Sequence, residues 1–437
     1  MGAYAAAGLG MDGQVPAGML GYGLGFGALV AVAHGVMRWV APWSDPLLLP
    51  LATMLNGIGL VMIWRIQLPL EQLRKDGVPV AVSSATSQLM WTGLGIALFV
   101  AVLVMFREPR VLQRYTYLAG FAGLVLLAIP ALLPASMSSI QGAKIWIRIG
   151  GFSIQPGEFA KLALLVFFAG YLVAKRDVLA LAGKRLLFID LPRARDLGPI
   201  LIVWFVSMLV LVAERDLGTS LLFFGTFLVL LYVATQRTSW VLIGLALFAG
   251  GAFIAYQLFS HVQARFDIWL NPWAHYDDPI GGSFQLVKGL FGLAAGGVLG
   301  TGLGQGRPQD VPLSQSDFIV TSIGEELGLT GLMAVLLIYV FLVERGLRTA
   351  IATRDPFVKL FAAGLAFIIT LQVFIVVGGV TRLIPLTGLT TPFLSAGGSS
   401  LLANWVIIAL LARMSDTSRR PAPQSIQDEG MTQVFSR

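Results

Sequence analysis

Asp277 and Asp278 are adjacent carboxylates that precede Pro279 in a long stretch rich in aromatic and polar residues. Aromatic and apolar neighbours can raise the pKa of a carboxyl group toward that of a useful base. Such a base can take a proton from a hydroxyl group while that hydroxyl attacks an electrophile. The same residues are also typical of a solvated turn, because acids before Pro and Gly favour turns. Both interpretations stay open on these residues alone.

Charged residues at the start of a predicted membrane helix form a second group of candidates. Glu158 and Lys161 follow Pro156, which suits a first helical turn, and their spacing places them on one helix face. Ionisable groups at membrane depth are costly and usually functional. We expect an ion pair that either receives a polar head group or simply locks the helix.

Three charges flank the same region of the sequence. Lys144 and Arg148 stand on either side of Trp146, and Asp216 directly precedes a predicted helix. The two cations can face an anionic head group or a pyrophosphate, or can anchor the chain at the interface. Asp216 suits an N-cap, which by itself explains an acid at this position.

Two later segments complete the candidates. Asp317, Glu325 and Glu326 lie near the start of a predicted helix, where the helix dipole favours acids. The run 385–400 is rich in Pro and Gly, and irregular backbone at membrane depth survives only beside a cavity or packed protein. We therefore expect this run to border a site.

Composition excludes several other kinds of chemistry. The chain has no cysteine, which excludes a catalytic thiolate and cysteine-ligated metals, and it has three histidines. No acidic cluster has convincing ligand spacing, so no metal ligands are predicted. Because pyrophosphate chemistry often uses Mg²⁺ or Mn²⁺, a divalent cation stays open. No Walker-type phosphate loop is present, which disfavours ATP-driven transport by this chain.

The elements that must position these residues are membrane helices. The chain is 56% hydrophobic and 12% charged, with a mean hydropathy of +0.80, whereas about 25% of the residues of a soluble domain are charged. Apolar windows predict an all-α polytopic membrane protein with about eleven spans. These spans are 18–40, 46–66, 88–106, 115–134, 156–174, 197–213, 217–235, 239–259, 321–343, 360–380 and 393–412.

Loop charges orient these spans, because short basic loops stay cytoplasmic. Alternate loops and the C-terminal tail hold 19 of the 30 basic residues and 10 of the 23 acids, a net charge of +9, and the other side carries −2. The basic balance therefore indicates a cytoplasmic face and not a nucleic-acid partner. The C-terminus is expected inside and the N-terminus outside, which predicts an additional helix upstream.

The predicted organisation has three parts. Residues 1–17 form an exposed N-terminal lead-in, and 18–413 form the transmembrane domain. Its large extracellular loop, 260–320, lies between the eighth and ninth spans. Residues 414–437 are expected to be a disordered cytoplasmic tail.

Five blocks of this sequence resemble the SEDS family (shape, elongation, division and sporulation). They are Gly142–Lys161, Asp216–Thr219, Asn271–Gln285, Pro312–Gly328 and Pro385–Ser400, and they occur in the family's order. The run from Gly378 to Pro385 is similar to the actinobacterial RodA-like branch. The resemblance implies a core of ten helices.

The resemblance also implies an activity, which is polymerisation of lipid II into peptidoglycan strands in the bacterial plasma membrane, for elongation and cell shape. The family's catalytic carboxylate precedes Pro in the large outer loop, and this position is Asp278, the expected general base. A class B penicillin-binding protein is the implied partner. The expected substrate-binding residues are Lys144, Arg148, Glu158, Lys161, Asp216, Arg265, Gln285, Arg382 and Ser399.

Two other functions remain as alternatives. A flippase or transporter of the lipid-linked precursor is a common role for so many helices, but it predicts charges near the bilayer midplane. A non-catalytic scaffold would be indifferent to Asp278.

Overall fold

The computed structural model describes residues 1–140, 143–149, 152–176, 184–186, 189–191, 216–278 and 282–421, with 202, 205, 206, 208 and 209. Within them, ten helices are long and apolar enough to cross a membrane, which confirms the prediction of a polytopic helical membrane protein. The expected span 197–213 lies almost entirely outside the described residues. The ten are α2 (Met19–Val40), α3 (Leu48–Lys75), α4 (Ala85–Met105), α5 (Thr116–Leu132, preceded by the 3-10 turn η1, Pro109–Tyr115), α7 (Gly157–Ala174), α10 (Leu217–Thr235), α11 (Thr238–Leu258), α14 (Ile319–Ala352), α15 (Pro356–Val380) and α16 (Gly398–Arg419).

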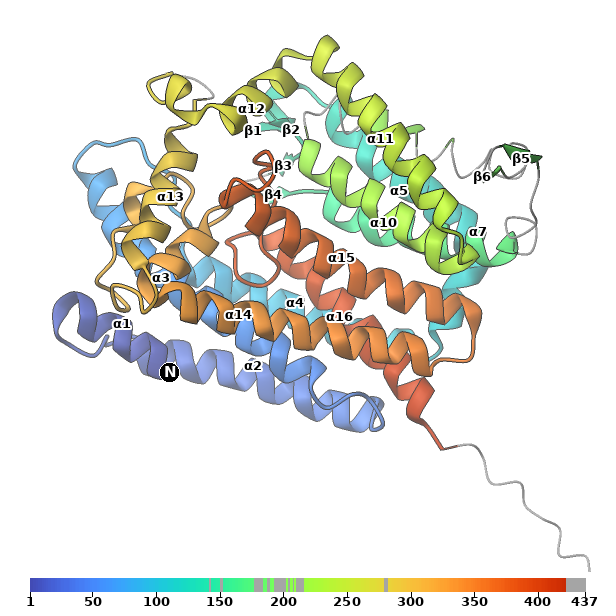
Figure 1. Ribbon diagram of the computed structural model, residues 1–437. Coiled ribbons are helices and arrows are strands. Elements are labelled where there is room, and N and C mark those ends of the chain that lie inside the picture. Colours follow the sequence, from blue (N-terminus) through green and yellow to red (C-terminus); the bar gives the residue numbers. More distant parts are fainter. Residues whose placement is uncertain are drawn as a thin grey trace, which may run out of the picture.

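The helices form a bundle around α16 (Figure 1). Of the apolar window of α16, 89% is buried within the protein, whereas none of the corresponding window of α11 is. Helix α16 packs on α4, α14 on α15, and α5 on α7. Because lipid tails are as apolar as leucine, an exposed apolar helix such as α11 is compatible with a membrane surface.

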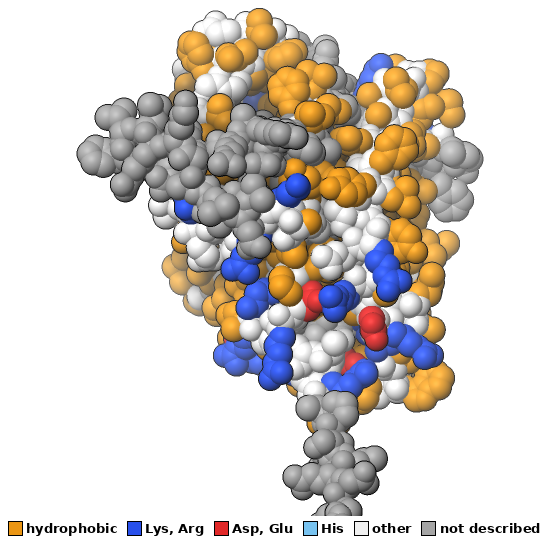
Figure 2. Space-filling model, turned by 90° about the vertical axis from the view of Figure 1, so that its right-hand side faces the viewer, with side chains coloured by type: hydrophobic (Ala, Val, Ile, Leu, Met, Phe, Trp, Pro, Cys, Tyr) orange, Lys and Arg blue, Asp and Glu red, His pale blue; other side chains and the backbone are white. Residues whose placement is uncertain are grey.

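One end of the bundle is basic. Figure 2 shows Lys and Arg side chains gathered over this end, next to the start of the C-terminal tail. The fully buried carboxylates of Asp45 and Asp416 pair there with Arg419 and Arg420. The loop charges of the sequence predict that this end faces the cytoplasm. The exposed cations are Arg38, Arg107, Arg110, Arg114, Arg348, Arg354, Lys359, Arg419 and Arg420.

Short elements occupy the opposite ends of the helices. After α5 and the turn α6 (Ala135–Ser138), two antiparallel hairpins lead to α7. The long connection from α11 to α14 is largely helical and runs across this end (Figure 1). The hairpins pair β1 (Ser139–Ile140) with β2 (Ala143–Lys144) and β3 (Ile147–Ile149) with β4 (Phe152–Ile154), and the connection holds α12 (Ser260–Leu270), η2 (Pro272–His275), α13 (Phe284–Gly296) and η3 (Pro308–Asp310). A third hairpin, β5 (Lys184–Leu186) with β6 (Ile189–Leu191), lies in the loop after α7.

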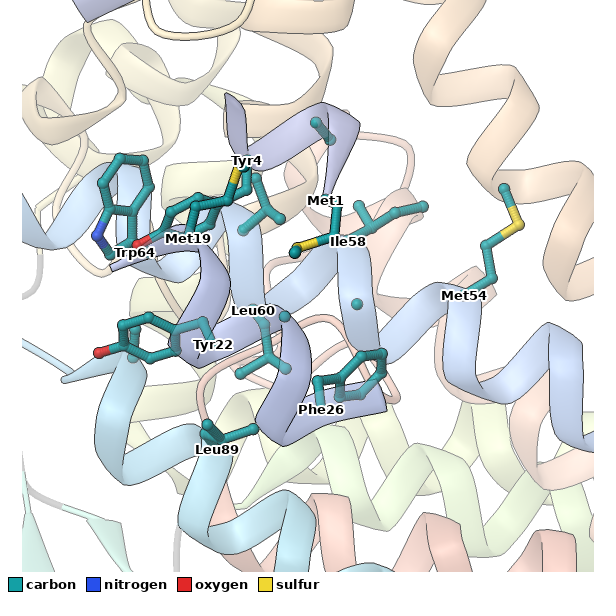
Figure 3. A pocket seen from close by; sticks show the side chains of 15 residues that line it. Met1, Tyr4, Met19, Tyr22, Phe26, Met54, Ile58, Leu60, Trp64 and Leu89 are labelled. Carbon is teal, nitrogen blue, oxygen red and sulfur yellow. The ribbon is translucent and has the colours of Figure 1, made fainter. Parts of the chain in front are cut away.

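The chain ends differ in detail from the expected organisation. The segment expected as a lead-in contains the helix α1 (Gly2–Asp12), in which the ring of Tyr4 lies 4.1 Å from that of Trp64 in α3. Between α1, α2, α3 and α4 lies an apolar cavity of about 230 Å³ (Figure 3). At the other end, α16 continues beyond residue 413 to Arg419. Asp416 is buried in this last part of the helix, where its Oδ1 accepts a hydrogen bond from the backbone N–H of Trp43 in the 41–47 turn. Residues 422–437 lie outside the described residues.

Candidate functional site

A buried ion pair lies at the start of α7. Lys161 Nζ is 2.5 Å from Glu158 Oε2, and the side chains of Lys161 and Glu158 are 2% and 7% exposed. Pro156 caps the start of α7. Glu158 and Lys161 are three residues apart in this helix, and this spacing alone places their side chains on one face. Lys161 also donates to Oε1 of Gln372 in α15, at 3.1 Å. The ammonium group is therefore held by two oxygens from two helices.

The same network continues into the broken segment between α15 and α16. Gln372 Nε2 donates to the carbonyl oxygen of Thr390 at 2.8 Å, and Thr390 Oγ1 lies 2.9 Å from Ser400 Oγ. Ser399 accepts from the backbone N–H of Gln155, at 2.9 Å. Most of the run 385–400 is non-helical, as its Pro and Gly content predicts, and it is held between α7 and α15.

Asp216, Arg265 and Asp317 form a second charged group beside this segment. Asp216 accepts from the N–H of Thr219 at 2.9 Å, so the predicted N-cap of α10 is present. Arg265 of α12 donates from Nη1 to the carbonyl oxygen of Leu386, at 2.5 Å. The contact of Arg265 with Leu386 joins α12 to the broken segment.

Burial controls the ionisation of this group. It raises the pKa of Asp317 to about 7, and the positive charge of Arg265 opposes the rise. Burial also raises the pKa of Asp216, whose hydrogen bond with Thr219 opposes the rise and whose repulsion by Glu158 adds to it. Burial lowers the pKa of Arg265. Both charged groups reach the broken segment, the first through the contact of Gln372 with Thr390 and the second through that of Arg265 with Leu386.

Asp278 lies in the turn between η2 and α13. Its side chain is 51% exposed, and its Oδ2 is 2.8 Å from Nδ1 of His275. Within the described part of the chain, no ion pair joins Asp278 to a lysine or arginine. Gln285, at the start of α13, donates to the carbonyl oxygen of Pro312 at 2.9 Å. Residues 279–281 lie outside the described residues.

Arg382 contacts the end of α12. Its Nε donates to the carbonyl oxygen of Trp269 and its Nη2 to that of Leu270, both at 2.8 Å, and Trp269 Nε1 donates back to the carbonyl of Arg382 at 3.1 Å. Arg382 has a φ of 62°, which is uncommon for a residue with a side chain. The guanidinium thus fastens α12 to the broken segment.

Lys144 and Arg148 lie on the two hairpins. Lys144 in β2 is half-buried, and Arg148 in β3 is exposed. Among the described residues, neither side chain takes part in a hydrogen bond or ion pair. Their ammonium and guanidinium groups remain available to an anion from outside the chain.

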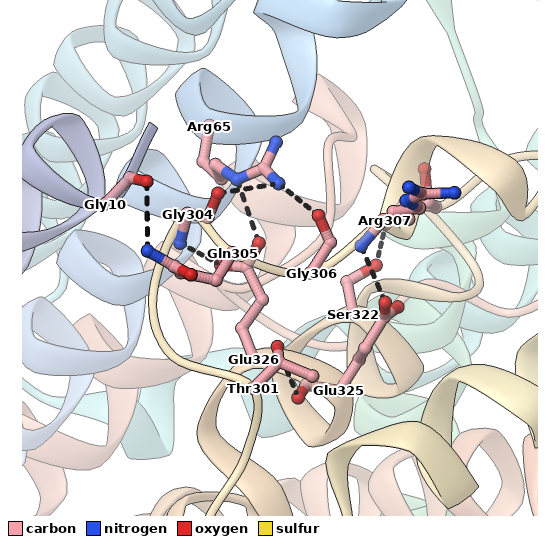
Figure 4. Close-up of polar contacts among 11 residues, drawn as sticks. Gly10, Arg65, Thr301, Gly304, Gln305, Gly306, Arg307, Ser322, Glu325 and Glu326 are labelled. Atoms are coloured by element: carbon pink, nitrogen blue, oxygen red, sulfur yellow. Dashed lines mark hydrogen bonds and ion pairs between the residues drawn. The ribbon is translucent and has the colours of Figure 1, made fainter. Parts of the chain in front are cut away.

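A buried ion pair between α3 and α14 was not predicted from the sequence. Arg65 Nε lies 2.8 Å from Glu326 Oε1, and the side chains of Arg65 and Glu326 are 4% and 0% exposed. Figure 4 shows how these groups and Glu325 bind the glycine-rich loop 302–307. Glu326 accepts from the N–H of Gly304, and Glu325 from the N–H of Arg307. The position of this cation in the middle of an apolar helix is the signal by which the sequence could have identified Arg65.

The role of these acids also differs from the expected one. Helix α14 begins at Ile319 and is interrupted at Gly328, where φ is 68° and ψ is −173°. Glu325 and Glu326 therefore lie beside the interruption and not in the first turn. Their hydrogen bonds to loop 302–307 and Arg65, rather than the helix dipole, account for their positions.

An apolar groove of about 790 Å³ runs between α14 and α15, with Glu344 and Arg348 paired at its basic end.

In the described ranges, no three His, Cys, Asp or Glu side chains gather as they do around a metal ion.

Comparisons with known proteins give the family. The model of the FtsW, RodA and SpoVE family, described as cell cycle protein, matches residues 46–420. The chain is 54% identical, over 94% of its length and 86% of the relative, to peptidoglycan glycosyltransferase RodA of Mycobacterium tuberculosis strain H37Rv. It is 34% identical, over 86% of its length and 98% of the relative, to stage V sporulation protein E of Bacillus subtilis.

Solved structures share the fold. RodA of Thermus thermophilus, a rod shape determining protein, superposes with a TM-score of 0.56 at 22% identity, over 87% of this chain and 98% of that one. A chain from a peptidoglycan synthase complex, solved in work on the coordination of polymerization and crosslinking, gives a TM-score of 0.57 at 24% identity, over 92% and 98%. The chain therefore belongs to the FtsW, RodA and SpoVE family of cell cycle proteins, the SEDS family that its five motif blocks indicate.

Proposed function

We propose that this chain is a peptidoglycan glycosyltransferase that polymerises lipid II into glycan strands for cell-wall elongation. The observation that carries the proposal is the 54% identity, across 94% of the chain, to relatives named peptidoglycan glycosyltransferase RodA. The charged site beside the broken segment fits a substrate with a sugar head and a pyrophosphate, because both need polar partners near the membrane surface.

In this reaction a hydroxyl group of the acceptor sugar attacks the anomeric carbon of the donor. The bond from that carbon to the undecaprenyl pyrophosphate breaks, and the hydroxyl proton goes to Asp278 as general base. Asp278 suits this role because its carboxylate is exposed and one hydrogen bond engages Oδ2, which leaves Oδ1 for the acceptor.

The cations of the site would hold the leaving pyrophosphate. Lys144 and Arg148 have exposed or half-exposed charges. At the broken segment, Lys161 supplies a buried positive charge and Arg265 a half-buried one. Preorganised cations stabilise the charge that develops on a leaving phosphate. The remaining predicted binding residues would hold these cations or the sugar, namely Glu158, Asp216, Gln285, Arg382 and Ser399.

The proposed topology places this site on the extracellular face and the C-terminus in the cytoplasm. The exposed cations around the start of the tail support it, because basic segments stay inside. Residues 18–413 then form the transmembrane domain with the outer loop 260–320, and 414–437 the cytoplasmic tail. A class B penicillin-binding protein is the proposed partner, in keeping with the fold shared with a chain of a peptidoglycan synthase complex.

The test is a gel assay of lipid II polymerisation by the purified chain, with and without its partner. Asp278→Ala and Asp278→Asn should abolish polymer, whereas Asp277→Asn, a neighbouring exposed carboxylate, should retain it. Normal polymer from Asp278→Ala would refute the assignment. Transport of lipid II across proteoliposomes without polymer, dependent on Glu158 and Lys161, would instead support a flippase.

A further inference from the structure

The turn that carries Asp278 also carries a histidine in direct contact with it. His275 Nδ1 lies 2.8 Å from Asp278 Oδ2, and the side chains of His275 and Asp278 are 36% and 51% exposed. An ionised carboxylate can only accept hydrogen bonds, so Nδ1 must carry the hydrogen. Neutral His275 therefore donates to Asp278 and keeps Nε2 unprotonated.

The backbone of His275 closes the same turn. Its carbonyl oxygen accepts from the N–H of Ser283 at 3.0 Å, and Ser283 Oγ donates to the carbonyl oxygen of Pro272. A Cβ atom at position 282 would lie 2.7 Å from the carbonyl oxygens of both His275 and Asp278, so this approach requires glycine. His275 thus holds the turn through its backbone and the carboxylate through its ring.

Aromatic contacts fix this turn to α13. The rings of Tyr276 and Phe284 are 5.4 Å apart, and those of Trp273 and Phe291 are 6.0 Å apart. The base of the turn is consequently anchored on both sides of His275. The contact with the imidazole then restrains the side chain of Asp278.

We propose that His275 is a positioning residue for Asp278, which fixes the carboxylate so that Oδ1 faces the acceptor hydroxyl. The inference rests on the proposed function.

Other charged groups lie on the elements that pack against η2. They are Asp277 in the same turn, Arg265 and Asp267 in α12, and Lys288 in α13, which lies 5.5 Å from the centre of the Phe284 ring. Across the described residues, none of the four forms an ion pair with His275 or Asp278. The contact between His275 and Asp278 is therefore the direct electrostatic influence on this base.

Two substitutions test the hydrogen bond to Asp278. His275→Asn places an amide nitrogen at the position of Nδ1, because both atoms are bonded to Cγ, so a donor is kept. His275→Leu removes the donor as well. Both changes are at a partly exposed position, and equal melting temperatures of the purified variants would show that folding is intact.

Polymerisation kinetics with lipid II give the first readout. We expect His275→Asn to keep kcat within about twofold, because its amide nitrogen still donates to Asp278. His275→Leu should lower kcat about tenfold with KM unchanged, the effect of one hydrogen bond to a charged group. A wild-type kcat in His275→Leu would overturn the proposal, and loss of polymer in Asp278→Ala would still uphold the proposed function.

NMR of the imidazole nitrogens gives a readout that does not depend on activity. The chain has three histidines, so His275→Asn identifies the signal of His275 by its disappearance. Asp278→Ala should change the chemical shift of His275 Nδ1, because the hydrogen bond to the carboxylate is lost. An unchanged chemical shift would show that the two side chains do not interact and would overturn the proposal.

Discussion

The ion pair between Glu158 and Lys161 permits a test that separates a site from a structural lock. Removal of one partner from a buried pair costs about 3–5 kcal/mol, because the other charge is left buried and unpaired. Lys161 keeps its contact with Gln372, so Glu158→Gln should lower the free energy of unfolding by about 3 kcal/mol, the lower end of this range. Lys161→Met leaves a 7%-exposed carboxylate without its cation and should cost about 4 kcal/mol.

The double variant decides between the two roles. Glu158→Gln with Lys161→Met removes both charges at similar side-chain volume, and its stability should return to within about 1 kcal/mol of the wild type. Lys161 is proposed to supply positive charge to the pyrophosphate. The double variant should therefore make no polymer, although its stability is restored.

Unfolding by SDS in mixed micelles measures the stabilities, and the lipid II gel assay measures polymer. Arg110→Ala is the matched control, since Arg110 pairs with Asp355 at 3.1 Å but is 72% exposed. Such a surface pair contributes about 0–1 kcal/mol. A double variant that recovers both stability and polymerisation would refute the site assignment and leave the pair as a helix lock.

Two further predictions concern the broken segment and its neighbours. Burial raises the pKa of Asp317 to about 7, so the folded state binds more protons than the unfolded state between pH 4 and 7, and stability falls as the pH rises through this range. Asp317→Asn should therefore raise the free energy of unfolding by about 1–2 kcal/mol at pH 8 and leave it unchanged at pH 4, and an equal effect at both pH values would contradict the assignment. Arg382→Gly relieves the φ of 62° but removes two hydrogen bonds to the end of α12. Hydrogen exchange should rise in Ser260–Leu270 and not in α14, and unchanged exchange in α12 would show that Arg382 does not fasten it.

Local patterns in the sequence predicted much of this architecture. The length of the apolar stretches predicted the spans, and the Pro and Gly content of the run 385–400 indicated its irregular backbone. The contact of Glu158 with Lys161 and the N-cap at Asp216 were also predictable. Each depends on residues within one turn of a helix, where the backbone geometry alone brings the groups together.

Contacts between distant segments were not predictable in the same way. Arg65 and Glu326 are 261 residues apart, and the sequence marks Arg65 only as a charge inside an apolar helix. Arg382 was predicted only as a substrate-binding residue, and the contacts of its guanidinium with the carbonyl oxygens at the end of α12 were not predicted. Helical periodicity says which face a side chain occupies, but not which other helix packs there.

The sequence by itself thus determined the membrane class, the spans, the charged candidates and the family. Tertiary structure decided which side chains meet. Lys161 reaches Gln372 of α15, Arg265 reaches Leu386 of the broken segment, and Asp278 pairs with His275. The physical reason is that burial and pairing depend on the packing of helices from distant parts of the chain. Composition and spacing report only the local geometry of each helix.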